Sequence, residues 1–303
     1  MKHSTNSKQW IISDSPSEEE MKIVQKGIED HNKKFSSGGL DIPTPDISLV
    51  LKDSSGNIVG GVITSMLTGV MHLEVLWIDE TYRGRGLGRD LVLQAERIGK
   101  KKGYSASQTW TFSFQAPEFY QSIGYKVVGI FDGYTNGITE YILLKKFESD
   151  EQNPYEVNEL NPVDFTILED KSETSMKILH EGLRNYVAEH VGELRKKNPG
   201  IHIKLVIKNE DDQVIGGVQA YTTLKAIHVV NLWVDEKFRN TGFGRELLTT
   251  AEKIAKENGC ISGLLNVLSF QSPEFFQKQG YIIFGVSDGY SDSIKEYFLK
   301  KRF

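Results

Sequence analysis

The alternation of apolar and polar positions predicts a mixed α/β chain built from short strands and amphipathic helices. In the first half, apolar runs bounded by turn residues predict strands at residues 49–52, 58–62, 71–78, 106–112, 125–130 and 140–145. Apolar residues at helical spacing from Leu91 to Ile98 predict a helix, because they share one face and Gly103 follows as a C-terminal cap. A second, short helix is predicted between Pro117 and Gly124.

The same pattern recurs 156 residues later in the chain. The windows 76–91 and 110–125, each 16 residues long, share 9 identical residues with their counterparts, where chance gives about one. The offset changes only near the N-terminal helices, where Gly27 aligns with Gly182. We therefore predict two tandem domains, at residues 1–147 and 163–303, joined by an acidic, proline-containing linker at 148–162.

Composition narrows the class of protein. The 303 residues carry a net charge of −5 without a basic block, which argues against a nucleic-acid binder. No apolar run approaches the roughly 18 residues that a membrane-spanning helix needs, and the N-terminus lacks the pattern of a secretory signal. The single Cys260 excludes an internal disulfide, and the histidines show no metal-ligand spacing. We expect a cytoplasmic protein that binds no metal, nucleic acid or membrane.

The most specific motif is a glycine-rich turn between a predicted strand and a predicted helix. It reads Arg83-Gly84-Arg85-Gly86-Leu87-Gly88 in the first half and Arg239-Asn240-Thr241-Gly242-Phe243-Gly244 in the second. Such a turn presents backbone N–H groups and the positive end of a helix dipole, and glycine permits the close approach that a pyrophosphate needs. The spacing matches neither a P-loop nor GxGxxG. Two copies favour phosphate binding over a purely structural turn.

The Arg-x-x-Gly-x-Gly turn, followed by a helix, a strand and a Phe-Tyr-x-x-x-Gly-Tyr segment, resembles the GNAT superfamily of acetyl-coenzyme A dependent N-acetyltransferases. The resemblance covers residues 46–147 and 202–303. It implies two tandem GNAT-like domains of mixed α+β fold, each with a mostly antiparallel central sheet flanked by helices. It also implies acetyl-CoA as the cofactor, with the pyrophosphate on the glycine turn and the pantetheine along the preceding strand.

The resemblance assigns cofactor-binding residues in both halves. Those in the first half are Leu76, Ile78, Arg83, Gly84, Arg85, Gly86, Leu87, Gly88 and Arg89. Those in the second half are Val234, Arg239, Thr241, Gly242, Phe243, Gly244 and Arg245.

Transfer of an acetyl group to an amine requires a base, since an alkylamine with a pKa of about 10.4 is mostly protonated at pH 7. Alternation along the strand at 71–78 places His72, Glu74, Leu76 and Ile78 on one face, so His72 and Glu74 are both candidates. His72 has the spacing from Arg83 at which some members of the resembled family carry a glutamate base, whereas Glu74 supplies a carboxylate. A structural role is the alternative for each.

A departing thiolate benefits from a proton donor, and Tyr120 occupies the Phe-Tyr position of the resemblance. A core aromatic role is the alternative. The counterparts 156 residues later are Val230 for Glu74 and Phe276 for Tyr120, while His72 persists as His228. We therefore predict that the first domain is catalytic and that the second is catalytically degenerate.

These features predict a GNAT-type N-acetyltransferase that transfers an acetyl group from acetyl-CoA to a primary amine of a small molecule, such as an antibiotic or a metabolite, by direct attack. Two alternatives stay open: a non-catalytic, CoA-binding regulatory or scaffold protein, and an N-acetyltransferase of proteins or peptides. The sequence indicates neither the acceptor amine nor the oligomeric state.

Overall fold

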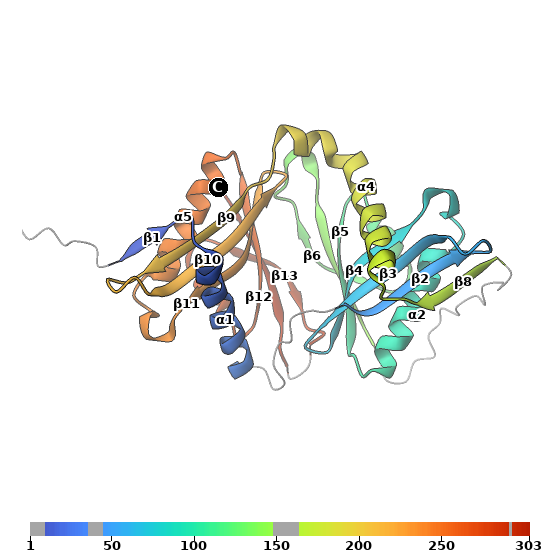
Figure 1. The fold of residues 1–303 in the computed structure, drawn as a ribbon, viewed down its shortest axis with the longest axis horizontal. Helices are drawn as coiled ribbons and strands as arrows, with labels where there is room; N and C mark the ends of the chain where they lie inside the picture. Colours follow the sequence, from blue (N-terminus) through green and yellow to red (C-terminus); the bar gives the residue numbers. More distant parts are fainter. Residues whose placement is uncertain (1–9, 36–44, 148–163, 291–292) are drawn as a thin grey trace, which may run out of the picture.

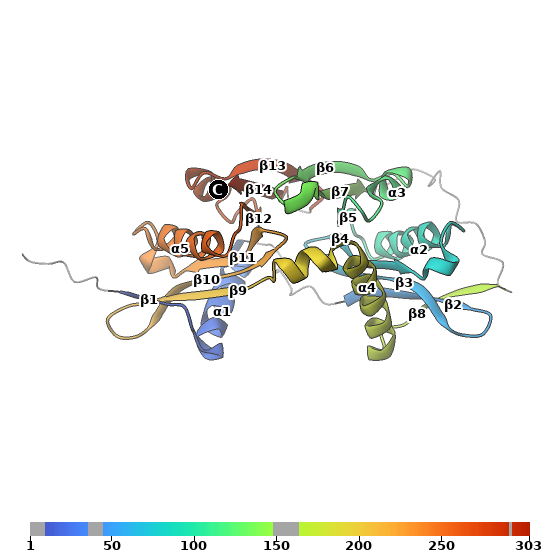
Figure 2. The same ribbon diagram turned by 90° about the horizontal axis from the view of Figure 1, so that it is seen from above.

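The computed structural model of the chain describes residues 10–35, 45–147, 164–290 and 293–303, which form two similar units joined edge to edge (Figure 1). The strands of these residues make one continuous sheet, in the order β1-β9-β10-β11-β12-β14-β13-β6-β7-β5-β4-β3-β2-β8. The order is symmetric about its centre: the strands at equal distances from the two ends, such as β1 and β8 or β9 and β2, are equivalent strands of the two units. The units meet where β6 and β13 pair, next to each other in the view from above (Figure 2).

The first unit is built mainly from the first half of the chain. Its strands are β2 (Pro45–Asp53), β3 (Ile58–Leu67), β4 (Val70–Ile78), β5 (Ala106–Phe112), β6 (Lys126–Phe131), β7 (Glu140–Lys146) and β8 (Phe165–Glu169). Its helices are η1 (Glu80–Tyr82), α2 (Leu87–Lys101), α3 (Pro117–Ser122), η2 (Thr135–Gly137) and α4 (Glu173–Lys197). The strands and helices predicted in the first half are confirmed, and β2 and β3 are longer than predicted.

The second unit repeats this arrangement. Its strands are β1 (Ile11–Ser13), β9 (His202–Lys208), β10 (Val214–Thr223), β11 (Ala226–Val234), β12 (Ser262–Leu268), β13 (Ile282–Ser287) and β14 (Glu296–Arg302). Its helices are α1 (Glu18–Phe35), η3 (Glu236–Phe238), α5 (Phe243–Glu257) and α6 (Pro273–Lys278). In both units the pairs β4–β5 and β11–β12 are parallel and the other pairs are antiparallel, which confirms the mixed, mostly antiparallel sheet.

Each unit takes one strand and one helix from the other half of the chain. β8 pairs with β2 and α4 packs on β3 and β4, while β1 pairs with β9 and α1 packs on β10 and β11. A glycine makes each helix contact possible. A Cβ on Gly182 would lie 2.3 Å from Cε2 of Trp77, and one on Gly27 would lie 2.1 Å from Cε2 of Trp233. The predicted equivalence of Gly27 and Gly182 is confirmed, and each glycine faces the tryptophan of the opposite half.

The predicted division of the chain follows its sequence repeat, whereas the packing units interleave. Residues 45–147 share a core with β8 and α4, and residues 202–303 share one with β1 and α1. The predicted linker, residues 148–162, lies outside the described residues. The boundaries at 147 and 163 therefore stay predictions about the repeat, and they do not separate two independently packed bodies.

Equivalent leucines fill the two cores. Leu91 of α2 is fully buried over the sheet of the first unit, and Leu247 of α5 is fully buried in the second. Cys260 is buried in the core of the second unit. At the junction Gly129 pairs with Gly285, where a Cβ on Gly129 would lie 3.1 Å from the Cα of Gly285. Close approach of β6 and β13 therefore requires glycine.

Candidate active site

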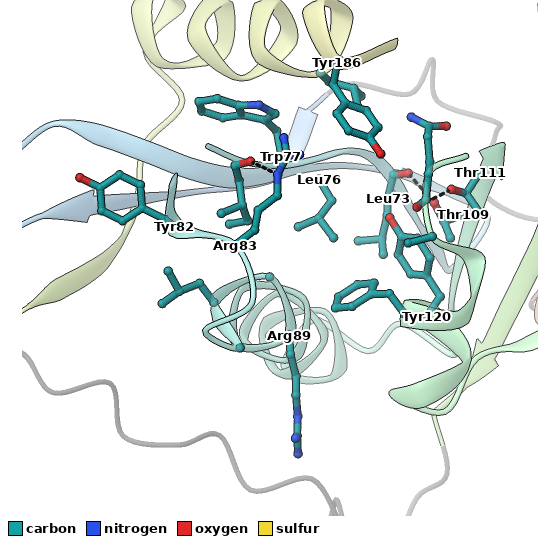
Figure 3. A pocket seen from close by; sticks show the side chains of 18 of the residues that line it. Leu73, Leu76, Trp77, Tyr82, Arg83, Arg89, Thr109, Thr111, Tyr120 and Tyr186 are labelled. Atoms are coloured by element: carbon teal, nitrogen blue, oxygen red, sulfur yellow. Dashed lines mark hydrogen bonds between the residues drawn. The ribbon is translucent and has the colours of Figure 1, made fainter. Parts of the chain in front are cut away.

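In the first unit a cavity of about 500 Å³ opens where β4 and β5 part. These parallel strands pair only as far as Leu73 and Thr109. Beyond that point the cavity is lined by β4, β5, the glycine turn, α3 and α4 (Figure 3). Tyr82 and Arg83 lie at one end of the cavity, and Tyr120 lies at the other. We refer to this space as the first cavity.

The glycine turn of the first unit presents open backbone to the first cavity. Gly84 and Gly86 have φ angles of 76° and 81°, and a Cβ on either would meet no atom within 4 Å. Gly86 is the N-cap of α2, and no side chain caps this helix. Nε of Arg83 donates to the carbonyl oxygen of Ile78 at 2.9 Å, which braces the turn. Uncapped amides beside open space are what a bound phosphate requires.

A β-bulge in β4 positions Glu74. Thr64 of β3 pairs with Leu73 and Ile63 pairs with Val75, so Glu74 is an extra residue without a partner on β3. Its carboxylate is exposed and lines the first cavity. A second polar group fixes its orientation, because the Ser65 hydroxyl donates to Oε1 of Glu74 at 2.6 Å.

The bulge also shifts the alternation of β4 by one residue. Leu73 before the bulge and Leu76 and Ile78 after it all pack in the core beneath α2. His72, the neighbour of Leu73, therefore faces the other way. The prediction that His72 shares a face with Leu76 and Ile78 is wrong, because strict alternation does not survive an inserted residue.

His72 belongs to the junction between the units. It is not among the residues that line the first cavity. Its Nε2 lies 3.2 Å from the hydroxyl of Tyr290, which donates to Oε2 of Glu296 at 2.7 Å. The counterpart His228 makes the same contact with Tyr134 at 2.9 Å, and burial lowers its pKa to about 4.

Tyr120 reaches the first cavity from α3. Ala116, the N-cap of α3, has a φ of 56°, an uncommon left-handed conformation at the cavity wall. The Tyr120 side chain is only 8% exposed, and burial raises its pKa to about 12, partly offset by a hydrogen bond with Thr109. The hydroxyl therefore keeps its proton at neutral pH and can act as a donor.

The second unit has a matching cavity of about 480 Å³ with different chemistry; we refer to it as the second cavity. Its turn keeps the geometry, since Gly242 has a φ of 100° and caps α5. Asn240 has a φ of 64° in place of Gly84, a conformation that asparagine tolerates. Val230 occupies the equivalent bulge and is 54% exposed, and Phe276 stands where the first unit has Tyr120.

Several site residues were not predicted from the sequence. Ser65 and Thr109, the partners of Glu74 and Tyr120, carry no motif. Leu183 and Tyr186 also line the first cavity, although they belong to α4 in the second half of the chain. The change of offset at Gly27 and Gly182 marked these helices as different from the rest of the repeat, but it did not indicate which sheet each helix covers.

Within the described ranges, no group of three or more His, Cys, Asp or Glu side chains is placed to hold a metal ion. In the same part of the chain, no helix is both long and apolar enough to cross a membrane.

Comparison with known proteins identifies the family. The Acetyltransferase (GNAT) family matches residues 10–125 and 160–281. Blasticidin-S acetyltransferase of Streptomyces morookaense is 38% identical over 92 residues, which cover 30% of this chain and 68% of that protein. An acetyltransferase of Agrobacterium fabrum is 26% identical over 127 residues, or 42% of this chain and 90% of that one.

Among solved structures, an acetyltransferase from Bacillus cereus has 34% sequence identity and a TM-score of 0.41, covering 45% of this chain and 96% of that chain. The family match extends over most of both halves, where the two cavities and their glycine turns lie. From the family match and the relative in Streptomyces morookaense, the chain belongs to the GNAT acetyltransferase family, in a tandem form with two GNAT regions, and it is an acyltransferase enzyme.

Proposed function

We propose that the protein is an acetyl-CoA dependent N-acetyltransferase of a small-molecule primary amine, and that the first unit performs the reaction. The observation that carries the proposal is that a single cavity is lined by the glycine turn, by Glu74 and by Tyr120. The relationship to a protein named blasticidin-S acetyltransferase supports a small-molecule acceptor.

The first cavity fits acetyl-CoA, which supplies an acetyl group activated as a thioester. The amides after Gly86 would hold the pyrophosphate, because the turn is open, uncapped and at the positive end of α2. The cavity continues from the turn along Leu76 and Ile78 toward Tyr120, so an extended chain can follow β4 between the two ends.

Glu74 is the proposed base. A C–N bond forms and a C–S bond breaks in the transfer, and the acceptor ammonium must lose a proton before its nitrogen can attack. Glu74 Oε1 accepts from Ser65, which leaves Oε2 directed to accept from an ammonium or a bridging water. His72 is not proposed for this role, because it contacts Tyr290 at the junction and does not line the first cavity.

Tyr120 is the proposed donor to the departing sulfur. With its pKa at about 12, the phenol is a weaker acid than a thiol of pKa about 8.5, so complete transfer of its proton is uphill. Tyr120 therefore acts by donating a hydrogen bond to the developing negative charge, and the proton released by the amine neutralises the thiolate afterwards.

The test is release of coenzyme A from acetyl-CoA in the presence of primary amines, compared between Gly86→Glu and Gly242→Glu. Both glycines have positive φ and open surroundings, so the two changes introduce the same strain and the same charge. We expect Gly86→Glu to abolish turnover and Gly242→Glu to leave most of it. The reverse pattern in folded proteins would contradict the proposal.

The same assay separates the alternatives. Binding of acetyl-CoA by calorimetry without turnover on small amines or peptides would favour a CoA-binding scaffold. Turnover on peptides but not on small amines would favour a protein acetyltransferase.

A further inference from the structure

We propose that the acceptor amine of the first unit binds against α4, so that the second half of the chain supplies the specificity-determining wall of a site whose proton-transfer groups lie in the first half. The inference rests on the proposed function and goes beyond it, because it assigns the acceptor surface and the class of amine. Leu183 and Tyr186 are the residues concerned.

The exchange of helices places these side chains. Gly182 packs against the ring of Trp77 on β4, which fixes both the height and the rotation of α4 over the bulged strand. Leu183 follows directly, and Tyr186 lies about one helical turn after Gly182, on the same side of the helix. Both residues line the first cavity. Any rotation of α4 that withdrew them would also break the contact between Gly182 and Trp77.

Tyr186 connects the two ends of the first cavity. Its hydroxyl donates to the carbonyl oxygen of Phe114 at 2.9 Å, in the loop that leads to α3 and Tyr120. The guanidinium carbon of Arg83 lies 4.8 Å from the centroid of the Tyr186 ring. The ring thus spans from the glycine turn to the catalytic end, on the side of the cavity opposite α2 and α3 (Figure 3).

The lining of the first cavity indicates the class of acceptor. Among its described lining residues Glu74 is the one carboxylate, and Arg83 and Arg89 add two positive charges. Aromatic side chains also line this cavity, among them Trp77, Trp110 and, from α4, Tyr186. One ammonium can pair with Glu74, but the further charges of a polycation would find no second carboxylate in this lining. An amine with one positive charge and an aromatic or apolar body therefore fits best.

The second unit offers matched controls. Ile28 and His31 of α1 line the second cavity at the positions equivalent to Leu183 and Tyr186. Nδ1 of His31 lies 3.4 Å from Nη2 of Arg239, where the first unit has the contact between Tyr186 and Arg83. A substitution at His31 thus disturbs an equivalent helix contact in the unit that lacks the proton-transfer groups.

The experiment uses the full-length protein and a panel of tryptamine, tyramine, blasticidin S, spermidine and kanamycin. The amine with the highest kcat/KM is taken forward to Tyr186→Ala, Leu183→Ala, Ile28→Ala and His31→Ala. We expect a monoamine with an aromatic body to be preferred over spermidine and kanamycin. Tyr186→Ala should raise its KM by about tenfold or more with kcat changed by less than about threefold, because an acceptor contact is lost and the chemical groups stay.

Calorimetric binding of acetyl-CoA shows whether each variant is folded. Its Kd should stay within about twofold of the unaltered protein, and His31→Ala and Ile28→Ala should leave the amine KM unchanged. Tyr186→Phe keeps the ring and loses only the bond to Phe114, so it should restore most of the amine affinity that Tyr186→Ala removes.

Three results would overturn the inference: preference for a polycation, an unchanged amine KM in Tyr186→Ala, or an equal rise of KM in His31→Ala. Failure of every amine despite binding of acetyl-CoA is a different result. It would contradict the proposed function itself and remove the basis of this inference.

Discussion

Cavities of about 500 and 480 Å³ lie at the same place in the two units, and each is bounded by a glycine turn, a bulged strand and a helix from the other half. The side chains beside the two cavities differ in polarity. Ser65, Glu74, Thr109 and Tyr120 of the first unit correspond to Tyr221, Val230, Leu265 and Phe276 of the second. Thr109 and Tyr120 both correspond to apolar residues, Leu265 and Phe276, so this pair leaves no buried hydroxyl without a partner in the second unit. The turn and the bulge are present in both units, whereas the proposed proton-transfer groups are present only in the first.

A second comparison concerns two buried carboxylates at the junction. Glu296 accepts hydrogen bonds from Gln108 at 2.8 Å, Asn266 at 2.6 Å and Tyr290 at 2.7 Å. Glu140 accepts the equivalent tyrosine bond, from Tyr134 at 2.8 Å.

The residues equivalent to the two amide donors of Glu296 are apolar or aromatic around Glu140. They are Leu264 in place of Gln108 and Trp110 in place of Asn266. Burial raises the pKa of Glu140 to about 7. The junction is therefore pseudo-symmetric in backbone, but its two carboxylates differ in their hydrogen-bond donors.

The largest expected effect on catalytic activity concerns the proposed base. We expect Glu74→Gln to lower kcat/KM at pH 7 by on the order of 10²- to 10⁴-fold, because the amide cannot accept the proton of the ammonium. His72→Gln, which changes the junction, should lower it by less than about threefold. Steady-state kinetics of the two variants decide between the residues. A larger loss of kcat/KM in His72→Gln than in Glu74→Gln would identify His72 as the base.

The next effect tests the donor. Tyr120→Phe should lower kcat on the order of 10²-fold with little change in acetyl-CoA affinity, since only the hydroxyl is removed. Because burial holds the pKa of Tyr120 at about 12, no descending limb from this group should appear in the pH profile of kcat below about pH 10. Phe276→Tyr is the control and should not change turnover. An effect of Tyr120→Phe below about threefold, with chemistry rate-limiting, would exclude this role.

A smaller effect is expected on stability at the junction. The pKa of Glu140 is about 7 in the folded protein and about 4.5 in the unfolded chain, so its protonation stabilises the fold as pH falls from 7 to 4.5. That contribution is lost above pH 7. Glu140→Gln should therefore raise the free energy of unfolding at pH 8 by about 3 kcal/mol and little at pH 4.5. Denaturant unfolding at the two pH values measures this difference.

Glu296→Gln is the matched variant for this measurement. It should lower stability at pH 8, because an amide nitrogen cannot accept from Gln108, Asn266 or Tyr290. A gain of stability in both variants would show that the two carboxylates are equivalent.

The smallest expected effect concerns the exchanged helices. Gly182→Ala and Gly27→Ala each push a Cβ into a tryptophan ring, and each should lower the free energy of unfolding by about 1 to 2 kcal/mol. Only Gly182→Ala should raise the amine KM, because α4 covers the catalytic unit. Equal effects of Gly182→Ala and Gly27→Ala on the amine KM would show that the acceptor does not bind against α4.

Local pattern predicted much of this protein. The strands other than β1 and β8, the helices α2 and α3, and both glycine turns follow from apolar periodicity and from turn residues such as Gly86, Gly103 and Pro117. These signals depend on a few neighbouring residues, so the elements can be predicted without knowing how the rest of the chain packs. Glu74 was predicted as a carboxylate on the strand before the turn and Tyr120 from the family resemblance, and the structure brings both to the first cavity.

The orientation of His72 and the partners of Glu74 and Tyr120 were decided by pairing between strands. A bulge is a mismatch of register between β3 and β4, and neither strand shows it alone. Alternation counted along β4 therefore failed at Glu74, and the contact with Ser65 nine residues away could not be counted at all.

The sequence by itself determined the two glycine turns, the repeat and the loss of polar groups in the second half, because each is a matter of residue identity at an aligned position. Only the tertiary structure decided which sheet each exchanged helix covers. Both sheets present the same tryptophan, Trp77 or Trp233, and both helices carry a matching glycine, Gly182 or Gly27. The glycine and the tryptophan are the same in both pairs, so residue identity does not show which helix covers which sheet. That choice depends on packing between distant parts of the chain, and it carries Tyr186 of α4 to the first cavity.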